Sequence, residues 1–274
     1  MPADAPGNPL RIGLIGFGRI GQRLARYLAA SPDRTQLVAI LLRPEQREAA
    51  QQLVNGVHIC TTWDEFRATH PMIAVECASA QTLVSLGTLI LGAGIDLIPL
   101  SLAALVDPAI EKALLAAASA GPGRLEIAAG AMGSIDFLAA GRLDDLRAVT
   151  FRAIYPAARW VGTPAEGMIN LPAVAKRTIF LRTSVREAAA LFPRHINVAV
   201  GVALAGLGLD QTIAELAADP VLTQAMFEID ADAGPGPVHL TVAGRNVALG
   251  ADPVDYTTFS VLRLLRRRTE RIAI

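Results

Sequence analysis

Three glycines with the spacing Gly-x-Gly-x-x-Gly lie near the start of the chain, in the run Gly16-Phe17-Gly18-Arg19-Ile20-Gly21. Such a run binds the pyrophosphate of a dinucleotide when a buried strand precedes it and a helix follows it. The first glycine makes the tight turn, the second lets the backbone approach the pyrophosphate at the helix N-terminus, and the third permits close packing of helix and strand. We therefore predict that these six residues bind a nicotinamide or flavin dinucleotide.

The residues on both sides of the glycine run have the required pattern. Residues 10–15 form an apolar run typical of a short buried strand, and apolar residues recur at helical spacing from Leu24 to Leu28. Further apolar runs at 36–42 and 72–77 alternate with helical stretches. Strands that are apolar throughout and alternate with helices are typical of a parallel sheet covered on both faces. The first part of the chain is therefore predicted to be a Rossmann-type domain.

The end of the second expected strand bears on the choice between NAD and NADP. An NAD-binding fold normally places Asp or Glu about 20 residues after the glycines, where it binds the ribose 2′-hydroxyl. Here the strand ends in Leu42, Arg43 and Pro44, and the first acid is Glu45. The guanidinium of Arg43 matches the geometry of a 2′-phosphate, so NADP is favoured over NAD. An ordinary exposed arginine would look the same in the sequence.

The character of the sequence changes near residues 121–123, which read Gly-Pro-Gly. Strands are expected after this point at 146–154 and 238–242, and helical stretches at 186–191 and 197–206. We therefore predict an α/β fold with a dinucleotide-binding domain at residues 1–128 and a smaller α/β or α+β domain at 129–274. Residues 257–268 are also predicted to be helical, and this last helix is free to pack back on the first domain.

The composition excludes several classes of protein. The 274 residues are 52% hydrophobic and 18% charged, unlike a disordered or fibrous chain. Because Lys+Arg and Asp+Glu both number 25, we expect neither nucleic acid nor an anionic membrane as a partner. Two cysteines, Cys60 and Cys77, are too few for a disulfide framework. The first eleven residues lack the pattern of a signal peptide, so we expect a soluble cytoplasmic protein.

Four segments in the second half of the chain resemble the L-aspartate dehydrogenase family. They are Gly130-Ala131-Met132-Gly133-Ser134-Ile135-Asp136, residues 160–166, residues 192–199, and residues 203–210 together with Ala218-Asp219-Pro220. The run Val75-Glu76-Cys77-Ala78-Ser79 and the glycine run agree with the same family. The resemblance extends from about residue 11 to 250, and both the order of the segments and the gaps between them fit.

This resemblance implies a dinucleotide-binding domain followed by a domain for substrate binding and dimerisation. The implied reaction is NAD(P)-dependent oxidative deamination of L-aspartate to iminosuccinate, which hydrolyses to oxaloacetate and ammonia. Iminosuccinate can also feed the biosynthesis of NAD. A homodimer that binds a small amino or imino dicarboxylate is therefore the expected form of the protein.

The resemblance also implies roles for particular residues. Ala131 and Asn197 match family positions that contact the nicotinamide cofactor, and Ala78 is assigned to the cofactor site with them. The family's catalytic histidine lies in an Asn-x-His-x-Ile pattern; Phe227 stands at its position here, and Ala225 replaces the asparagine. A phenylalanine cannot accept a proton. A working enzyme must therefore take its base from another residue.

Oxidation of an amino acid requires a neutral amine, and hence a base close to it. The available substitutes are His195, Glu166 and Glu228. Glu228 would face away from Phe227 if its segment is a strand, because neighbouring side chains alternate. We favour His195, which lies two residues before Asn197, although a surface or helix-capping histidine would show the same pattern. None of the four histidines has the spacing of a metal site.

The substrate carboxylates need cationic partners, and arginine is the natural one because its guanidinium is always charged and bidentate. The candidates are Arg152, Arg159, Arg182 and Arg194. Three functions stay open at this point: an enzyme acting on aspartate, a catalytically impaired dinucleotide-binding sensor or scaffold, and a dehydrogenase of the same fold whose substrate has changed. The surroundings of Phe227 would discriminate between them, because a base there favours the enzyme.

Overall fold

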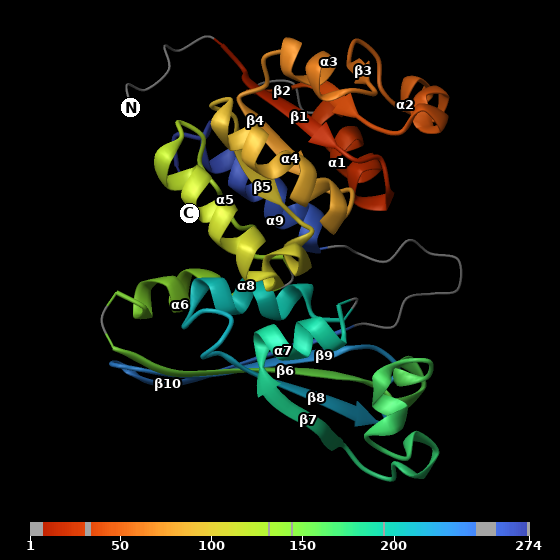
Figure 1. Ribbon diagram of the computed structural model, residues 1–274, viewed down its shortest axis with the longest axis vertical. Helices are drawn as coiled ribbons and strands as arrows, with labels where there is room; N and C mark the ends of the chain where they lie inside the picture. Colours follow the sequence, from red (N-terminus) through yellow and green to blue (C-terminus); the bar gives the residue numbers. More distant parts are fainter. Residues whose placement is uncertain are drawn as a thin grey trace. The chain divides into compact units, whose positions relative to one another are not determined.

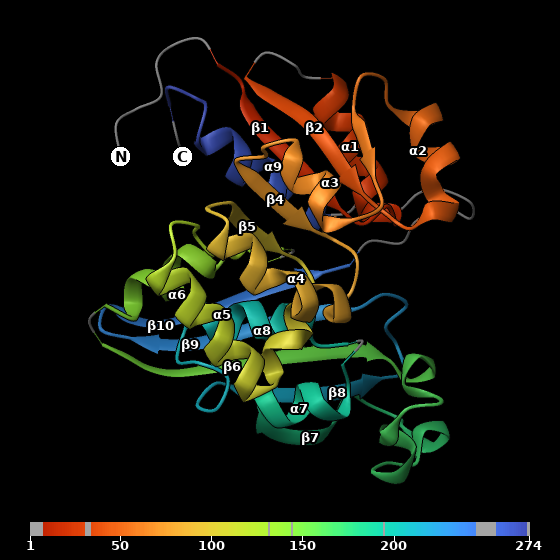
Figure 2. The same cartoon turned by 45° about the horizontal axis from the view of Figure 1, so that its top comes forward.

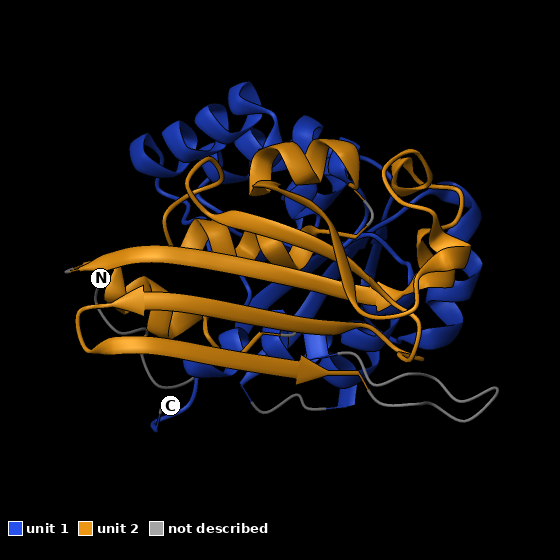
Figure 3. Cartoon of the chain, turned by 90° about the horizontal axis from the view of Figure 1, so that it is seen from below, with its two compact units in different colours: residues 1–130, 255–274 blue, residues 131–254 orange. Residues whose placement is uncertain are grey.

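The computed structural model describes residues 8–30, 34–130, 132–143, 145–193, 195–244 and 256–272. The chain divides into two compact units, residues 1–130 with 255–274, and residues 131–254 (Figure 3). The first unit therefore extends to residue 130, two residues beyond the boundary expected from the sequence. Residues 255–274, expected in the range of the second domain with a last helix free to pack back on the first, group with the first unit.

The sheet of the first unit is parallel throughout, with the strand order β3-β2-β1-β4-β5 (Figure 1). Its strands are β1 (Leu10–Ile15), β2 (Thr35–Leu41), β3 (His58–Cys60), β4 (Ile73–Glu76) and β5 (Asp96–Pro99). Its helices are α1 (Arg19–Ala30), α2 (Arg47–Leu53), α3 (Trp63–Ala68), α4 (Ala80–Gly92), α5 (Pro108–Ala120) and α9 (Tyr256–Arg267). The predicted Rossmann-type fold is thereby confirmed.

The strand order of this sheet reverses at β1. From β1 the chain passes through α1 to β2 on one side, whereas β4 lies on the other side of β1 and leads through α4 to β5. Because crossovers between parallel strands are right-handed, α1 and α4 cover opposite faces. Ligands of such sheets bind outside the carboxyl ends of the strands at the point of reversal. A ligand that follows this rule would lie at the carboxyl ends of β1 and β4.

Helix α9 is part of the core of the first unit. Val261 of α9 is fully buried in the same hydrophobic cluster as Ile12 of β1. Just after the helix, the guanidinium of Arg268 donates to the carboxylates of Asp96 and Glu126. The packing of this last helix on the first domain was left open by the sequence, and its burial here explains why residues 255–274 group with the first unit. Its apolar spacing predicted a helix, but not which surface it would cover.

The second unit has a mixed sheet with the order β10-β9-β6-β8-β7, in which β6 and β8 are parallel and the other pairs antiparallel. Its strands are β6 (Leu146–Pro156), β7 (Thr178–Ser184), β8 (Ile213–Asp219), β9 (Met226–Ala233) and β10 (Gly236–Ala243). Its helices α6 (Ile135–Gly141), α7 (Val185–Leu191) and α8 (Asn197–Ala205) lie over one face of the sheet (Figure 2). The predicted second α/β domain is confirmed.

The other face of this sheet is covered by no described helix of the second unit (Figure 3). Charged side chains on this face pair across the strands. Arg152 of β6 donates through Nε to Glu215 of β8 at 2.6 Å, and it also donates to Glu228 of β9. Phe151 and Ala153, the neighbours of Arg152 on β6, are fully buried instead. The alternation along β6 therefore separates an apolar face under the helices from an ion-paired face.

Candidate functional site

The glycine-rich turn joins β1 to α1, and its glycines are required for different reasons. Gly16 has φ +108°, and a Cβ there would lie 2.8 Å from the backbone nitrogen of Ala78. A Cβ on Gly21 would lie 2.4 Å from the carbonyl oxygen of Gly16. By contrast, a Cβ on Gly18 would meet no atom within 4 Å, and its φ lies outside the left-handed region. Packing within the protein therefore explains Gly16 and Gly21 but not Gly18.

The open space at Gly18 is what a dinucleotide needs. The turn lies at the carboxyl end of β1, where the sheet order reverses, and α1 begins directly after it at Arg19. The first amide groups of a helix have no carbonyl partner within the helix, and together with the helix dipole they favour an anion. A side chain at position 18 would occupy the space in front of the turn. The residues present thus fit a bound pyrophosphate.

The remaining residues of the turn contribute differently. The side chain of Phe17 is 3% exposed and belongs to the core, so this residue can offer a ligand only its backbone. The Phe17 carbonyl accepts hydrogen bonds from the side-chain amides of Gln22 and Gln46, each at 3.3 Å. Arg19 is exposed and Ile20 is half-buried. Gln46 therefore ties the glycine turn to the segment that follows β2.

Arg43 lies in that segment, two residues after the end of β2, and its side chain is 75% exposed. Its Nη1 atom lies 3.3 Å from Oε1 of Glu45, whose side chain is also mostly exposed. Such exposed pairs contribute little free energy, typically about 0–1 kcal/mol. Arg43 can therefore exchange Glu45 for a better anionic partner at the carboxyl edge of the sheet.

Two residues at the end of β4 were not singled out individually from the sequence. Glu76 is fully buried and accepts hydrogen bonds from the loops after β4 and β5. The Cys77 thiol lies 3.4 Å from the carbonyl oxygen of Ile15 and 3.5 Å from that of Gly16, and burial raises its pKa. An acid directly after an apolar strand is the signal that could have identified Glu76. Cys77 therefore contacts the glycine turn directly, whereas Glu76 binds the loops that follow β4 and β5.

In the second unit, Phe227 lies on β9 between Ala153 of β6 and Val242 of β10. Its ring stacks on Phe151 at a centroid distance of 5.8 Å and meets Tyr155 edge-on at 5.9 Å. These ring contacts give a phenylalanine an apolar environment. The structure therefore places no titratable group at the position where the family resemblance expects histidine.

His195 also contacts Tyr155. Its ring stacks on Trp160 at 5.0 Å and meets Tyr155 edge-on at 5.4 Å. The Tyr155 hydroxyl donates to the carbonyl oxygen of His195 at 3.4 Å, and burial raises the pKa of Tyr155 to about 12 although the charge of Arg159 lowers it. Asn197 begins α8 two residues further on and is exposed. Tyr155, not identified from the sequence, thus contacts both His195 and Phe227.

The two acidic candidates for the base lie elsewhere. Glu228 is on the ion-paired face of the sheet, opposite to Phe227, where it accepts from Arg152 and, at 2.9 Å, from Nη1 of Arg177. Glu166 is exposed in the 3₁₀ helix Pro164–Gly167. Of the three candidates for the base, His195 is the one whose ring contacts Tyr155, and the Tyr155 ring also contacts Phe227.

The four candidate arginines are also separated by the structure. Arg152 and Arg182 are both ion-paired with Glu215. Arg194 lies outside the described residues, as does Ala131. Arg159 is exposed in the 3₁₀ helix Ala157–Trp160 and, within the described part of the chain, has no carboxylate within 4 Å. Among the described candidates, Arg159 is therefore the cation available to a substrate.

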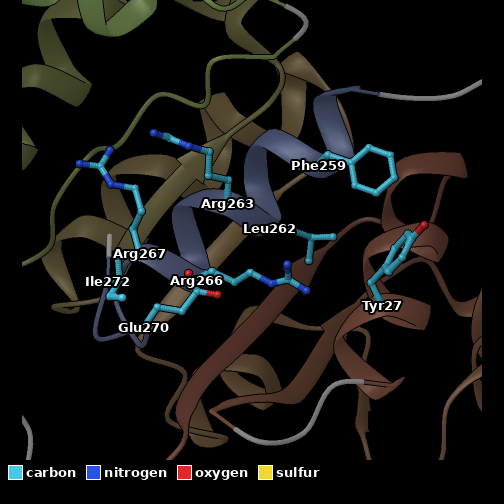
Figure 4. Close-up of a pocket in the computed structure, with 8 residues that line it drawn as sticks. All are labelled: Tyr27, Phe259, Leu262, Arg263, Arg266, Arg267, Glu270 and Ile272. Carbon is cyan, nitrogen blue, oxygen red and sulfur yellow. The ribbon is translucent and has the colours of Figure 1, made fainter. Parts of the chain in front are cut away.

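A groove on the first unit lies along α9 and is separate from the glycine turn. Its lining includes Tyr27, Phe259 and three arginines of α9 (Figure 4). Arg266 extends toward Tyr27, whereas Arg263 and Arg267 point to the other side, so these cations do not converge on one position. No group of metal-binding side chains occurs among the described residues, and none of the described helices could span a membrane.

Both units of the chain match known protein families. Residues 16–128 match the family model for the NAD binding domain of homoserine dehydrogenase, and residues 136–268 match the model for the C-terminal part of aspartate dehydrogenase. The L-aspartate dehydrogenases of Cupriavidus necator and Pseudomonas aeruginosa are 34% and 33% identical to this chain, over 97% of it and 100% of each relative.

A solved structure shows the same fold. Aspartate dehydrogenase from Thermotoga maritima matches with a TM-score of 0.74 and 22% identity, over 97% of this chain and 100% of that one. The glycine turn and the matched models define the class of the protein as an NAD(P)-dependent oxidoreductase. Within that class, the chain belongs to the L-aspartate dehydrogenase family.

Proposed function

We propose that the chain catalyses the NAD(P)-dependent oxidative deamination of L-aspartate to iminosuccinate, which hydrolyses to oxaloacetate and ammonia. The observation that carries this proposal is the similarity to L-aspartate dehydrogenases over 97% of the chain. We further propose a cytoplasmic homodimer whose iminosuccinate feeds the biosynthesis of NAD. Neither a nucleic acid nor a membrane is a proposed partner, in keeping with the net charge of zero.

The bound nicotinamide cofactor supplies the hydride acceptor for this reaction. We assign its pyrophosphate to the backbone of residues 16–21, where the open space at Gly18 supports the assignment. Ala78 packs against the Gly16 turn and is assigned to the same site. Ala131 and Asn197 are proposed to contact the nicotinamide, on the basis of the family resemblance.

We propose that Arg43 selects NADP by pairing with its 2′-phosphate. Arg43→Ala is then expected to weaken NADPH binding by about 1.5–3 kcal/mol, the scale of a hydrogen bond to a charged group, and to leave NADH binding almost unchanged. Fluorescence titration with both cofactors measures this. Glu45→Gln is the matched control, because it releases Arg43 from its exposed pair and should not weaken NADPH binding. Equal losses for both cofactors in Arg43→Ala would refute the assignment.

His195 is the proposed base, and it takes the proton of the substrate amine on its imidazole. Its contact with Tyr155, which also contacts Phe227, supports this choice over Glu228 on the opposite face of the sheet. Stacking on Trp160 holds the imidazole in one orientation. A positioned base contributes typically about 10²–10⁴-fold to the rate.

Arg159 is the proposed partner of a substrate carboxylate. Arg159→Gln is expected to raise KM for aspartate about 10- to 100-fold with a smaller effect on kcat, because a bidentate charged contact is lost. Steady-state kinetics at saturating cofactor measures this. Arg147→Gln, on the same strand–turn segment but already paired with Asp145, should leave KM unchanged. An unchanged KM in Arg159→Gln would remove Arg159 from the site.

The proposed function is tested by following NADH and NADPH oxidation with oxaloacetate and ammonia, and with a panel of other 2-oxo acids. Formation of aspartate that requires ammonia supports the proposal. A preference for a different 2-oxo acid would instead favour a dehydrogenase with a changed substrate. This second candidate is favoured by the apolar contacts of Phe227 with Phe151 and Tyr155, which suit a less polar substrate. Cofactor binding without any turnover would indicate a sensor or scaffold.

A further inference from the structure

Glu76, the last residue of β4, is a buried acid with an unusual set of partners. It is 0% exposed. Its Oε1 atom accepts from the backbone nitrogens of Ala78 at 2.8 Å and Ser79 at 3.0 Å, and from the hydroxyl of Ser101 at 2.9 Å. Its Oε2 atom accepts from the backbone nitrogen of Ser101 at 3.1 Å. Four donors from two different loops therefore meet on one carboxylate.

No cation accompanies this carboxylate, because within the described residues its hydrogen-bond partners are backbone amides and one hydroxyl. Burial of a charge without an ion pair is costly, and it raises the pKa of Glu76, whereas the four donors lower it. A neutral side chain would fill the same space at a smaller cost. We therefore interpret the buried acid as fixing the positions of the two loops, and not only as a contribution to stability.

The loops that Glu76 joins lie beside the glycine turn. Cys77 donates from its backbone nitrogen to the carbonyl oxygen of Ile15 at 2.9 Å, and Ala78 is the residue on which Gly16 packs. Leu100 and Ser101 directly follow β5, and the backbone nitrogen of Leu100 donates to the carbonyl oxygen of Glu76 at 2.8 Å. One carboxylate therefore connects the ends of β4 and β5 to the turn at the end of β1.

We propose that Glu76 is a positioning residue for the cofactor site: it holds the loop at 77–79 and Ser101 in the conformation that nicotinamide cofactor binding requires, without touching the cofactor. This inference rests on the proposed function, since it concerns the same cofactor. The carboxyl edge of β1, β4 and β5 is where a dinucleotide lies in this fold. Because Gly16 packs closely against the backbone of Ala78, a displaced 77–79 loop would also displace the Gly16 turn.

Asp96 provides a matched control. It begins β5, so it lies at the opposite edge of the sheet from the end of β4. It accepts from the backbone nitrogen of Arg124 at 2.7 Å and pairs with Arg268. Asp96 thus also joins segments of the first unit, but away from the cofactor edge. Asp96→Asn is expected to lower the melting temperature and to change cofactor affinity by less than about twofold.

Glu76→Gln is the decisive variant. An amide has one acceptor oxygen, so its NH₂ group must face either the backbone amide of Ser101 or the backbone amides of the 77–79 loop, and none of these can accept a hydrogen bond. We expect Kd for the preferred cofactor to rise about tenfold or more, with a loss in melting temperature similar to that of Asp96→Asn. In the NAD(P)H oxidation assay with oxaloacetate and ammonia, KM for the cofactor should rise while kcat at saturating cofactor stays within about threefold.

Ser101→Ala is the milder second variant, because it removes the hydroxyl donor and leaves the carboxylate in place. Its Kd should rise about threefold, so the proposal can be tested even if Glu76→Gln does not fold. Kd values equal to wild type in Ser101→Ala and in folded Glu76→Gln would overturn the positioning role while the proposed function stands. A wild-type protein that binds neither NADH nor NADPH would overturn the proposed function and this inference with it.

Discussion

Gly18→Val is expected to abolish measurable binding of NADH and NADPH, with Kd at least about 100-fold higher, while the protein remains folded. The backbone at Gly18 is outside the left-handed region and a Cβ would meet no protein atom within 4 Å, so a valine costs the fold little. The branched side chain would occupy the space that the pyrophosphate needs. Fluorescence titration gives the affinity, and thermal unfolding of the same sample verifies the fold.

Gly92→Val controls for the effect of a branched residue at an open glycine. Gly92 ends α4 in the same unit, and a Cβ there also meets no atom within 4 Å. This variant should bind both cofactors like wild type. Gly21→Val should instead destabilise the protein, because its Cβ would lie 2.4 Å from the Gly16 carbonyl oxygen. An unchanged titration in Gly18→Val would refute the assignment of the turn.

The double variant Phe227→His with Ala225→Asn is expected to raise turnover of aspartate by about 10²–10⁴-fold, the usual contribution of a positioned base. We expect weak activity in the wild type, supported by His195, because Phe227 cannot accept a proton. The imidazole is smaller than the phenyl ring, so it fits, but it loses the stacking on Phe151 and needs a polar partner. Initial rates with aspartate at saturating cofactor measure the change.

The single variants separate the contributions of the two substitutions. Ala225→Asn alone should have the weak activity of the wild type, and Phe227→His alone should recover only part of the gain. His195→Ala should remove the wild-type activity if His195 is the base. High wild-type activity that does not respond to the double change would contradict the loss of a base at position 227. If both proteins bind the cofactor but turn over no aspartate, a changed substrate or a sensor becomes the better account.

The local parts of the fold were predictable from the sequence. The run from residue 10 to residue 28 contains its own strand, turn and helix signals, and the structure has β1, the glycine turn and α1 there. The family was also recognised from short segments in the correct order, and the comparisons confirm it. The roles of Phe227, Asn197 and Arg43 stay predictions, because they concern ligands.

Contacts between distant residues were not predictable in this way. The pairing of Arg152 with Glu228 joins positions 76 residues apart. It makes Arg152 a weaker candidate for binding a substrate carboxylate and Glu228 a weaker candidate for the base. The sequence did not distinguish Arg159 from Arg152 as candidates. In the structure Arg159 lies in an exposed 3₁₀ helix and has no ion pair among the described residues, whereas Arg152 is paired with Glu215. The difference depends on the face of β6 and on the strands beside it.

By itself, the sequence determined the dinucleotide fold of the first unit and the family. These follow from residue types and short-range spacing, which local backbone preferences and alternating burial translate directly into strands, turns and helices. The tertiary structure alone decided that α9 completes the first unit, that Tyr155 contacts both His195 and Phe227, and that Glu76 joins two loops. Each of these contacts joins residues that are distant in the sequence and depends on which surfaces meet when sheets and helices pack. Short-range sequence patterns do not predict which surfaces those are.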